Sequence, residues 1–279
     1  MRTTTILAVL LIVSPAFAAD PKVQSDVAYT EPADTKRTLD LYIPNSGKDH
    51  PVAVWIHGGG WRNGDKRGVQ QKPDAFVEKG FVFVSVNYRF VPDVTVKEQA
   101  ADIAKSIRWV HDHAKEYGGS PDKIFVMGHS AGAHLAALVC TDDRYLKAEG
   151  LPLSIIKGCV PVDTAAYDVP KQVASSRGRL LEMYTGVFGT QENQKECSPI
   201  THVSKGKSIP PFLILHVADR PDSRMQSEAF AKSLQDAGVA ARVVPAEGKN
   251  HATINRELGR PDDKPTRAVF EFLATLLKK

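Results

Sequence analysis

Two patterns of apolar residues alternate along the chain. Short runs such as 52–56 and 211–217 are almost continuously apolar, as in strands buried on both faces of a parallel sheet. Longer segments such as 96–117 carry apolar residues every three or four positions, as amphipathic helices do. The predicted strands are 27–30, 38–44, 52–56, 81–87, 123–127, 155–162, 211–217 and 241–245, and the predicted helices are 70–79, 96–117, 131–140, 226–237 and 265–277. This order predicts an α/β fold with a mostly parallel eight-stranded sheet and helices on both faces.

One stretch, 164–208, interrupts the alternation and is too long for a bare loop. It contains a predicted helix at 179–188, and its position between two strands predicts a small cap insertion. No internal repeat or linker divides the rest, so residues 19–279 are expected to form a single domain. With 42% hydrophobic residues, a chain of 279 residues can bury a large core without metals or disulfides.

The first 18 residues have the pattern of a cleavable secretory signal peptide. Arg2 supplies the positive start, residues 6–13 form an apolar core, and an A-x-A sequence ends at Ala18, where cleavage is expected. A spanning helix needs roughly 20 apolar residues, and no cysteine directly follows the predicted cleavage site, so no stable membrane anchor is expected. The sequence therefore predicts an exported protein, either periplasmic or secreted.

Charge and cysteine content narrow the range of partners. The net charge of +4 falls to +3 without Arg2, and this small excess is spread along the chain, so no nucleic-acid partner is expected. The three cysteines are an odd set, and Cys140 and Cys159 fall in predicted core elements, where unpaired cysteine is common. No disulfide is predicted, and the sequence carries no signal for the oligomeric state.

Candidate chemistry begins at the sequence Gly128-His129-Ser130-Ala131-Gly132, which joins an apolar run to a helix-forming run. A serine between a strand and a helix, with glycine two residues to either side, is the pattern of a nucleophile elbow. Such a turn holds the hydroxyl at a helix N-terminus, where backbone N–H groups and the helix dipole favour a developing anion. The pattern indicates acyl transfer, although a serine-capped helix start has the same form.

A second motif, His57-Gly58-Gly59-Gly60-Trp61, follows the predicted strand at 52–56. Consecutive glycines allow the backbone to approach a ligand closely and to direct N–H groups at it. We expect the amides of Gly59, Gly60 and Ala131 to form an oxyanion hole, each donor contributing roughly 3 to 4 kcal/mol in comparable sites. A phosphate cradle is disfavoured, because neither a G-x-G-x-x-G nor a P-loop pattern is present.

With these two motifs the chain resembles the α/β-hydrolase superfamily, in particular the carboxylesterases that carry H-G-G-G-W and G-H-S-A-G. The hormone-sensitive-lipase-like and feruloyl/acetyl-xylan esterase-like groups are the most similar branches. The resemblance extends from the strand before His57 to the C-terminal helix and implies an α/β-hydrolase fold. The segment before His57 is too short for the extensive N-terminal lid of many lipase relatives, which disfavours long-chain lipids as substrates.

A serine nucleophile needs a base, and in this fold an acid and then a histidine follow the serine along the chain. Asp219 lies in the first turn after the predicted strand 211–217, and His251 follows the strand 241–245. The order predicts Ser130, Asp219 and His251 as the catalytic triad.

Two other aspartates compete for the role of the acid. Asp163 ends the predicted strand 155–162, where some hydrolases of this fold keep their acid. Asp222 precedes a helical run, a position that also suits a helix cap.

The other histidines are weaker candidates for a base. His129 lies inside the elbow, and His134 is one helical turn beyond Ser130, where a packed helix residue is expected. His111 and His113 are two apart on a predicted helix and therefore diverge. No motif with metal-ligand spacing is present, so neither a metal nor a cofactor is predicted, and chelators are expected to leave activity unchanged.

Export and the resemblance together suggest a serine carboxylesterase for short acyl groups on carbohydrate, such as acetyl or feruloyl. We expect Trp61, Asp163, Tyr167 and His202 to approach the small-molecule or carbohydrate ester. Two other functions remain open: an arylformamidase-like amide hydrolase, and a non-catalytic binding module on the same scaffold. The first is usually cytosolic, which the predicted signal peptide opposes, and intact Ser130 and His251 oppose the second.

Overall fold

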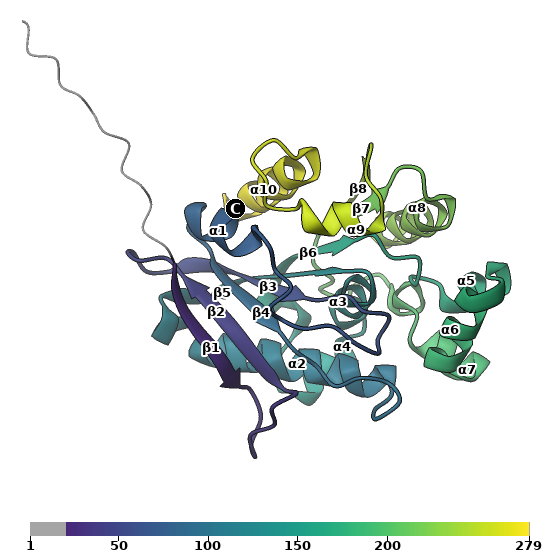
Figure 1. Ribbon diagram of the computed structural model, residues 1–279, viewed down its shortest axis with the longest axis horizontal. Helices are drawn as coiled ribbons and strands as arrows, with labels where there is room; N and C mark the ends of the chain where they lie inside the picture. Colours follow the sequence, from purple (N-terminus) through teal and green to yellow (C-terminus); the bar gives the residue numbers. More distant parts are fainter. Residues whose placement is uncertain (1–20, 279) are drawn as a thin grey trace, which may run out of the picture.

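The computed structural model describes residues 21–278. The predicted signal peptide lies outside this range. An eight-stranded sheet runs through the molecule in the order β1-β2-β4-β3-β5-β6-β7-β8 (Figure 1). β1 and β2 pair in antiparallel fashion, as do β2 and β4, and every other pairing is parallel. The strands are β1 (Lys22–Ala28), β2 (Thr38–Ile43), β3 (His50–Ile56), β4 (Val82–Val86), β5 (Gly119–His129), β6 (Ile156–Val162), β7 (Phe212–Val217) and β8 (Ala241–Ala246).

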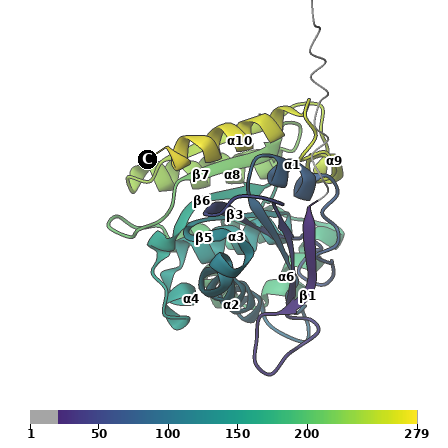
Figure 2. The ribbon, with the colours of Figure 1, turned by 90° about the vertical axis from the view of Figure 1, so that its left-hand side faces the viewer.

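Helices cover both faces of the sheet, as predicted, because successive residues of the central strands point to opposite faces. In β3, Val54 and Ile56 belong to one apolar cluster, whereas Trp55 belongs to the other. The first cluster packs against α2 (Val96–His113), α3 (Ala131–Thr141) and α8 (Pro221–Asp236). The second packs against α1 (Lys72–Glu78), α9 (His251–Arg256) and α10 (Lys264–Leu277), which lie across the sheet from α2 and α3 (Figure 2). Short helices α4 (Asp143–Ala148), η1 (Ala114–Tyr117) and η2 (Leu153–Ile155) complete this part of the fold.

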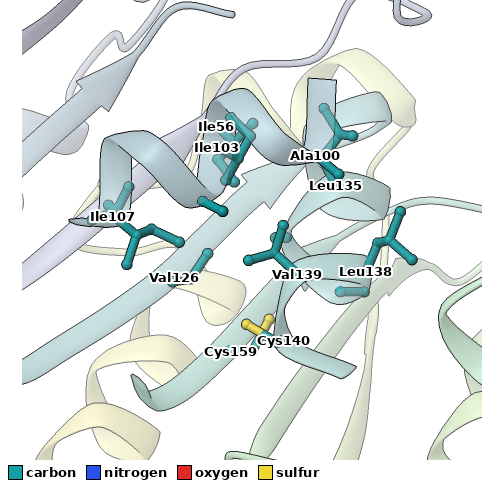
Figure 3. Packing of buried hydrophobic residues seen from close by; sticks show 14 of the residues in the cluster. Ile56, Ala100, Ile103, Ile107, Val126, Leu135, Leu138, Val139, Cys140 and Cys159 are labelled. Carbon is teal, nitrogen blue, oxygen red and sulfur yellow. The ribbon is translucent and has the colours of Figure 1, made fainter. Parts of the chain in front are cut away.

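The layer between α2, α3 and the sheet is filled by buried apolar side chains. Ile103 and Ile107 of α2 lie beside Val126 of β5 and the α3 residue Val139, as Figure 3 shows. The same view shows that the sulfur atoms of Cys140 and Cys159 lie next to each other. These two cysteines and Cys197 are buried free thiols. Full burial on both sides keeps the strands that carry the site in fixed register.

The segment between β6 and β7 contains α5 (Val169–Ser175), α6 (Gly178–Phe188), α7 (Gln191–Glu196) and η3 (Pro199–His202). Helices α5, α6 and α7 pack against one another and form a group at one end of the sheet (Figure 1). The predicted helix 179–188 is thus present within the three-helix insertion. No helix in the described part of the chain combines the length and the apolar character needed to cross a membrane.

Both edges of the sheet are interrupted. β1 shifts register between Gln24 and Val27, and Asp26 in this interval has a positive φ of 57°. The buried amino group of Lys66 binds the carboxylates of Asp26 and Asp40 at 2.6 and 2.5 Å, which holds the irregular edge strand to β2. At the opposite edge, β8 contains Pro245, which has no N–H to donate.

Several element boundaries differ from the prediction. The first strand covers 22–28 rather than 27–30, and α8 begins at Pro221 rather than at residue 226, because proline suits the first turn of a helix. The helix α9 was not predicted. Its start is stabilised by a capping box, in which Asn250 and Thr253 exchange side-chain and backbone hydrogen bonds.

Candidate active site

Ser130 occupies a strained turn between β5 and α3. Its φ of 56° is unusual for a residue other than glycine. The two flanking glycines are required by space: a Cβ at Gly128 would lie 2.4 Å from the carbonyl oxygen of Gly132, and a Cβ at Gly132 would lie 2.1 Å from that of Ile56. The backbone N–H of Ser130 donates to Val162 O at 3.0 Å, which fixes the turn against β6. The predicted nucleophile elbow is therefore present.

His251 connects Ser130 to a buried carboxylate. The hydroxyl of Ser130 donates to His251 Nε2 at 2.9 Å, and His251 Nδ1 donates to Asp163 Oδ2 at 2.6 Å. These three residues come from the end of β5, the start of α9 and the turn after β6. The imidazole is held in the tautomer that can accept the serine proton.

The carboxylate beside His251 belongs to Asp163, which corrects the expectation for Asp219. Asp219 lies exposed in the turn after β7, whereas the side chain of Asp163 is fully buried. The backbone N–H of Asp163 donates to Leu215 O, so the turn after β6 crosses the end of β7. Asp163 therefore lies beside His251, where the sequence analysis expected Asp219. Asp222, the third candidate, lies in the first turn of α8 and pairs with Arg220 at 3.2 Å.

Asp163 is held by four neighbouring groups. Its Oδ1 accepts hydrogen bonds from Val217 N at 3.0 Å and Ser223 Oγ at 2.7 Å, and its Oδ2 contacts His251 and Arg220. Burial alone would raise the pKa of the Asp163 carboxyl, but the hydrogen bond from His251 and the charge of Arg220 lower it below its usual range. Asp163 is therefore ionised at neutral pH.

Arg220 was not identified from the sequence, although it contacts two of these three residues. Its Nη1 lies 2.5 Å from Asp163 Oδ2 and 2.8 Å from His251 Nδ1, and its Nη2 contacts Asp222. An arginine that follows a strand and precedes Pro221 carries no distinctive sequence signal. The position of β7 between β6 and β8 brings Arg220 close to Asp163, which follows β6, and to His251, which follows β8.

The glycine loop after β3 lies directly over Ser130. A Cβ at Gly58 would be 3.1 Å from Ser130 Cβ, and one at Gly59, where φ is 128°, would lie 1.8 Å from Asn63 O. Ala131 is the first residue of α3, so its N–H has no partner within the helix. In the described part of the chain, the N–H groups of Gly59 and Gly60 donate to no backbone carbonyl. These amides can donate to a ligand at Ser130.

A cleft of about 660 Å³ opens above Ser130. Apolar residues of α6, namely Leu180, Met183 and Tyr184, line one part of it, and Gly60 lies below them with its Cβ position 3.6 Å from Met183 Sδ. Another part is lined by Gln70 and Asn255, because Lys72 Nζ lies within hydrogen-bond distance of both Gln70 Oε1 and the Asn255 carbonyl. The cleft thus has an apolar part under α6 and a polar part beside α9.

Two of the four residues expected near the substrate lie elsewhere. Trp61 lines the cleft, and Asp163 lies beneath it. Tyr167 is fully buried and stacks on Phe230 with ring centroids 4.5 Å apart, so it belongs to the core. His202 contacts the carbonyl of Glu196 through Nε2 at 2.7 Å, and it does not line the cleft.

The sequence profile of the BD-FAE family matches residues 39–234, which include the glycine loop, the elbow and Asp163. The chain belongs to the BD-FAE family. Its eight-stranded sheet and covering helices are those of the α/β-hydrolase fold, as the resemblance implied. His251 lies beyond the matched segment of this BD-FAE chain.

Curated relatives of this BD-FAE chain include the esterase LipQ of Mycobacterium tuberculosis, which is 31% identical over 90% of this chain and 62% of its own length. The kynurenine formamidase of Danio rerio is 30% identical over 84% of this chain and 76% of its own. A probable isoprenylcysteine alpha-carbonyl methylesterase of Arabidopsis thaliana, ICMEL1, is 29% identical over 84% and 52%, respectively. The chain spans little more than half the length of the isoprenylcysteine methylesterase relatives that it matches.

Solved structures share the fold over almost the whole BD-FAE chain. A thermophilic esterase from Thermogutta terrifontis, Est2, has a TM-score of 0.69 at 27% identity, with 93% of this chain and 92% of that one covered. A truncated carbohydrate esterase from gut microbiota has a TM-score of 0.79 at 22% identity, with 95% and 99% covered. At that identity the second match demonstrates the common fold alone.

The remaining histidines near the site are packed. His129 Nε2 donates to the carbonyl of His251 at 2.8 Å, and burial, with the nearby charge of His251, lowers the pKa of His129 to about 3. His134 bridges Trp61 and the carbonyl of Cys197, as expected for a packed helix residue, and burial lowers the pKa of His134 to about 4. Among residues 21–278, no group of three or more His, Cys, Asp or Glu side chains is arranged to hold a metal ion.

Proposed function

We propose that the protein is an exported serine carboxylesterase that hydrolyses short-chain acyl esters. The observation that carries the proposal is the continuous chain of hydrogen bonds from Ser130 through His251 to Asp163, at the floor of an open cleft. A hydroxyl, an imidazole and an ionised carboxylate in this order form the arrangement that activates a serine for acyl transfer.

In the first half-reaction, Ser130 Oγ attacks the ester carbonyl carbon while its proton passes to His251 Nε2. The N–H groups of Gly59, Gly60 and Ala131 stabilise the negative charge that develops on the carbonyl oxygen. His251 then gives its proton to the leaving alcohol as the carbon–oxygen bond of the ester breaks. A water molecule loses its proton to His251 and attacks the acyl-enzyme, which releases the acid and restores the serine.

The three-helix insertion is proposed as the cap of the acyl side. Leu180, Met183 and Tyr184 project from α6 over the glycine loop, and Tyr184 and Phe188 pack against Trp61. This small apolar surface suits an acyl group such as acetyl or feruloyl. The signal-peptide pattern is consistent with an ester substrate that lies outside the cytoplasm.

The test is covalent labelling and turnover of the purified protein. A fluorophosphonate probe is expected to label Ser130, identified by peptide mass, and p-nitrophenyl acetate is expected to be hydrolysed. The matched variants are Ser130→Ala, which should lose both, and Ser175→Ala, which alters a serine of α5 outside the cleft. Absence of labelling in the folded protein would favour a non-catalytic binding module.

A second candidate function is amide hydrolysis, which the similarity to the kynurenine formamidase favours. Parallel assays with p-nitrophenyl acetate and N-formylkynurenine separate the two functions. A kcat/KM for the formamide well above that for a panel of esters would assign the site to the amide. Export is tested separately, because the intact mass of the exported protein should begin after Ala18.

A further inference from the structure

The polar part of the cleft lies on the side of the leaving alcohol. In the proposed reaction the ester oxygen receives its proton from His251 Nε2, so the alcohol must begin beside His251. Asn255 is four residues further along α9, on the same face of the helix, and it is one of the residues that line the cleft. An alcohol larger than methanol therefore extends along α9 toward Asn255.

Two amide side chains here have unused hydrogen-bonding capacity. Asn255 Oδ1 is shielded from bulk water and has no partner, which is uncommon for a buried polar atom. Gln70 also lines the cleft, and its Oε1 accepts a hydrogen bond from Lys72 Nζ at 3.2 Å, which leaves its Nε2 as a donor. The φ of Gln70 is 49°, a conformation that needs support from its surroundings.

That support comes from Lys72, the first residue of α1. Its fully buried amino group also donates to the carbonyl of Asn255 at 2.8 Å and to that of Val69 at 3.4 Å, and it lies 4.6 Å from the ring centre of Trp55. One lysine therefore joins the Gln70 loop to α9. No carboxylate accounts for its burial in the described structure, and desolvation lowers the pKa of Lys72 to about 7.

We propose that Gln70 and Asn255 form a subsite for a polyhydroxylated alcohol, such as a sugar ring, on the leaving-group side of the cleft. A donor and an acceptor held close to the same lysine match neighbouring hydroxyls, because each hydroxyl both donates and accepts. This inference rests on the proposed function, and it assigns the alcohol part of the ester to residues that the triad does not include.

The experiment compares two esters with the same acyl group and rings of equal size: a methyl glucopyranoside carrying one acetyl group, and cyclohexyl acetate. The wild-type protein should prefer the glycoside ester. Asn255→Leu and Gln70→Met, which replace the amides by apolar side chains, should each lower kcat/KM for the glycoside ester about tenfold or more. Both variants should change kcat/KM for cyclohexyl acetate by less than about threefold.

Arg256→Met is the matched control, because Arg256 adjoins Asn255 on α9 but is exposed outside the cleft. This variant should leave kcat/KM for both esters unchanged. Equal losses for the two esters, or no loss in either variant, would overturn the subsite. If Asn255→Leu does not fold, Gln70→Met at its exposed position decides the question. If the protein hydrolyses p-nitrophenyl acetate and the fluorophosphonate probe labels Ser130, the proposed function stands even where these variants contradict the subsite.

Discussion

The two halves of the candidate site are determined by different kinds of interaction. Around Ser130 the constraint is steric, since backbone carbonyls occupy the space that a Cβ at Gly128 or Gly132 would need. Around Asp163 the constraint is polar, because hydrogen bonds from Val217, Ser223 and His251 and the charge of Arg220 hold one buried carboxylate. The nucleophile half therefore tolerates no added atom, whereas the acid half can be altered one polar contact at a time.

The largest expected effect tests the acid half. Asp163→Asn should lower kcat for p-nitrophenyl acetate about ten-thousand-fold, because the amide no longer stabilises the required tautomer and charge of His251. Asp219→Asn is the matched control and should stay within about twofold of wild type, since its carboxylate is exposed in a neighbouring turn. The reverse result would return the role of the acid to Asp219.

The steric half is tested by adding one methyl group. Gly132→Ala should lower the free energy of unfolding by about 3 kcal/mol or more, because its Cβ would overlap Ile56 O. Gly238→Ala provides the control: its φ of 83° imposes strain, but no other atom lies within 4 Å, so about 1 kcal/mol is expected. Urea denaturation measures the free energy of unfolding of both variants. Similar losses in the two variants would show that strain, rather than overlap, dominates.

A third prediction tests Lys72, which joins the Gln70 loop to α9, the helix that begins with His251. The pKa of Lys72 is about 7 in the folded protein and about 10.4 in an unfolded chain, so between these values the unfolded state binds more protons. The stability of the wild type should therefore rise with pH relative to Lys72→Met, by about 2 to 3 kcal/mol from pH 7 to pH 9. Urea denaturation at both pH values gives the difference. If the difference in free energy of unfolding between the wild type and Lys72→Met is the same at pH 7 and pH 9, Lys72 stays charged in the folded protein.

The smallest effects are expected outside the cleft. His202→Ala and Tyr167→Phe should leave KM for short p-nitrophenyl esters within about twofold of wild type, because His202 contacts the carbonyl of Glu196 and Tyr167 packs on Phe230. Trp61→Ala, which alters the lining of the cleft, is the positive control. A selective rise in KM for His202→Ala would restore that residue to the substrate site.

This contrast explains which parts could be predicted from the sequence. The elbow and glycine loop were found because their steric demands act over a few residues, and only glycine meets them at Gly128 and Gly132. The order of strands and helices followed from apolar periodicity, which local sequence records directly. His251 followed from the order of the triad in the fold.

The acid could not be chosen in this way, because Asp163 and Asp219 both follow buried strands. Which of them meets His251 depends on how the turn after β6 crosses β7, a tertiary property. The positive φ of Asp163, 53°, likewise has no local signal. Lys72 lies within the predicted helix 70–79 and carries no sign of burial, which depends on its contact with α9. In the sequence, the start of α9 is marked only by the capping residues Asn250 and Thr253.

The interrupted edges of the sheet affect how separate copies of the protein meet. A straight strand with a free row of N–H and C=O groups invites pairing with another molecule, which leads to aggregation. The register shift and charges of β1 bend and solvate one border, and Pro245 removes a donor from the other. Strand addition from a neighbouring copy is therefore disfavoured at both borders, which protects the protein from fibre-like assembly.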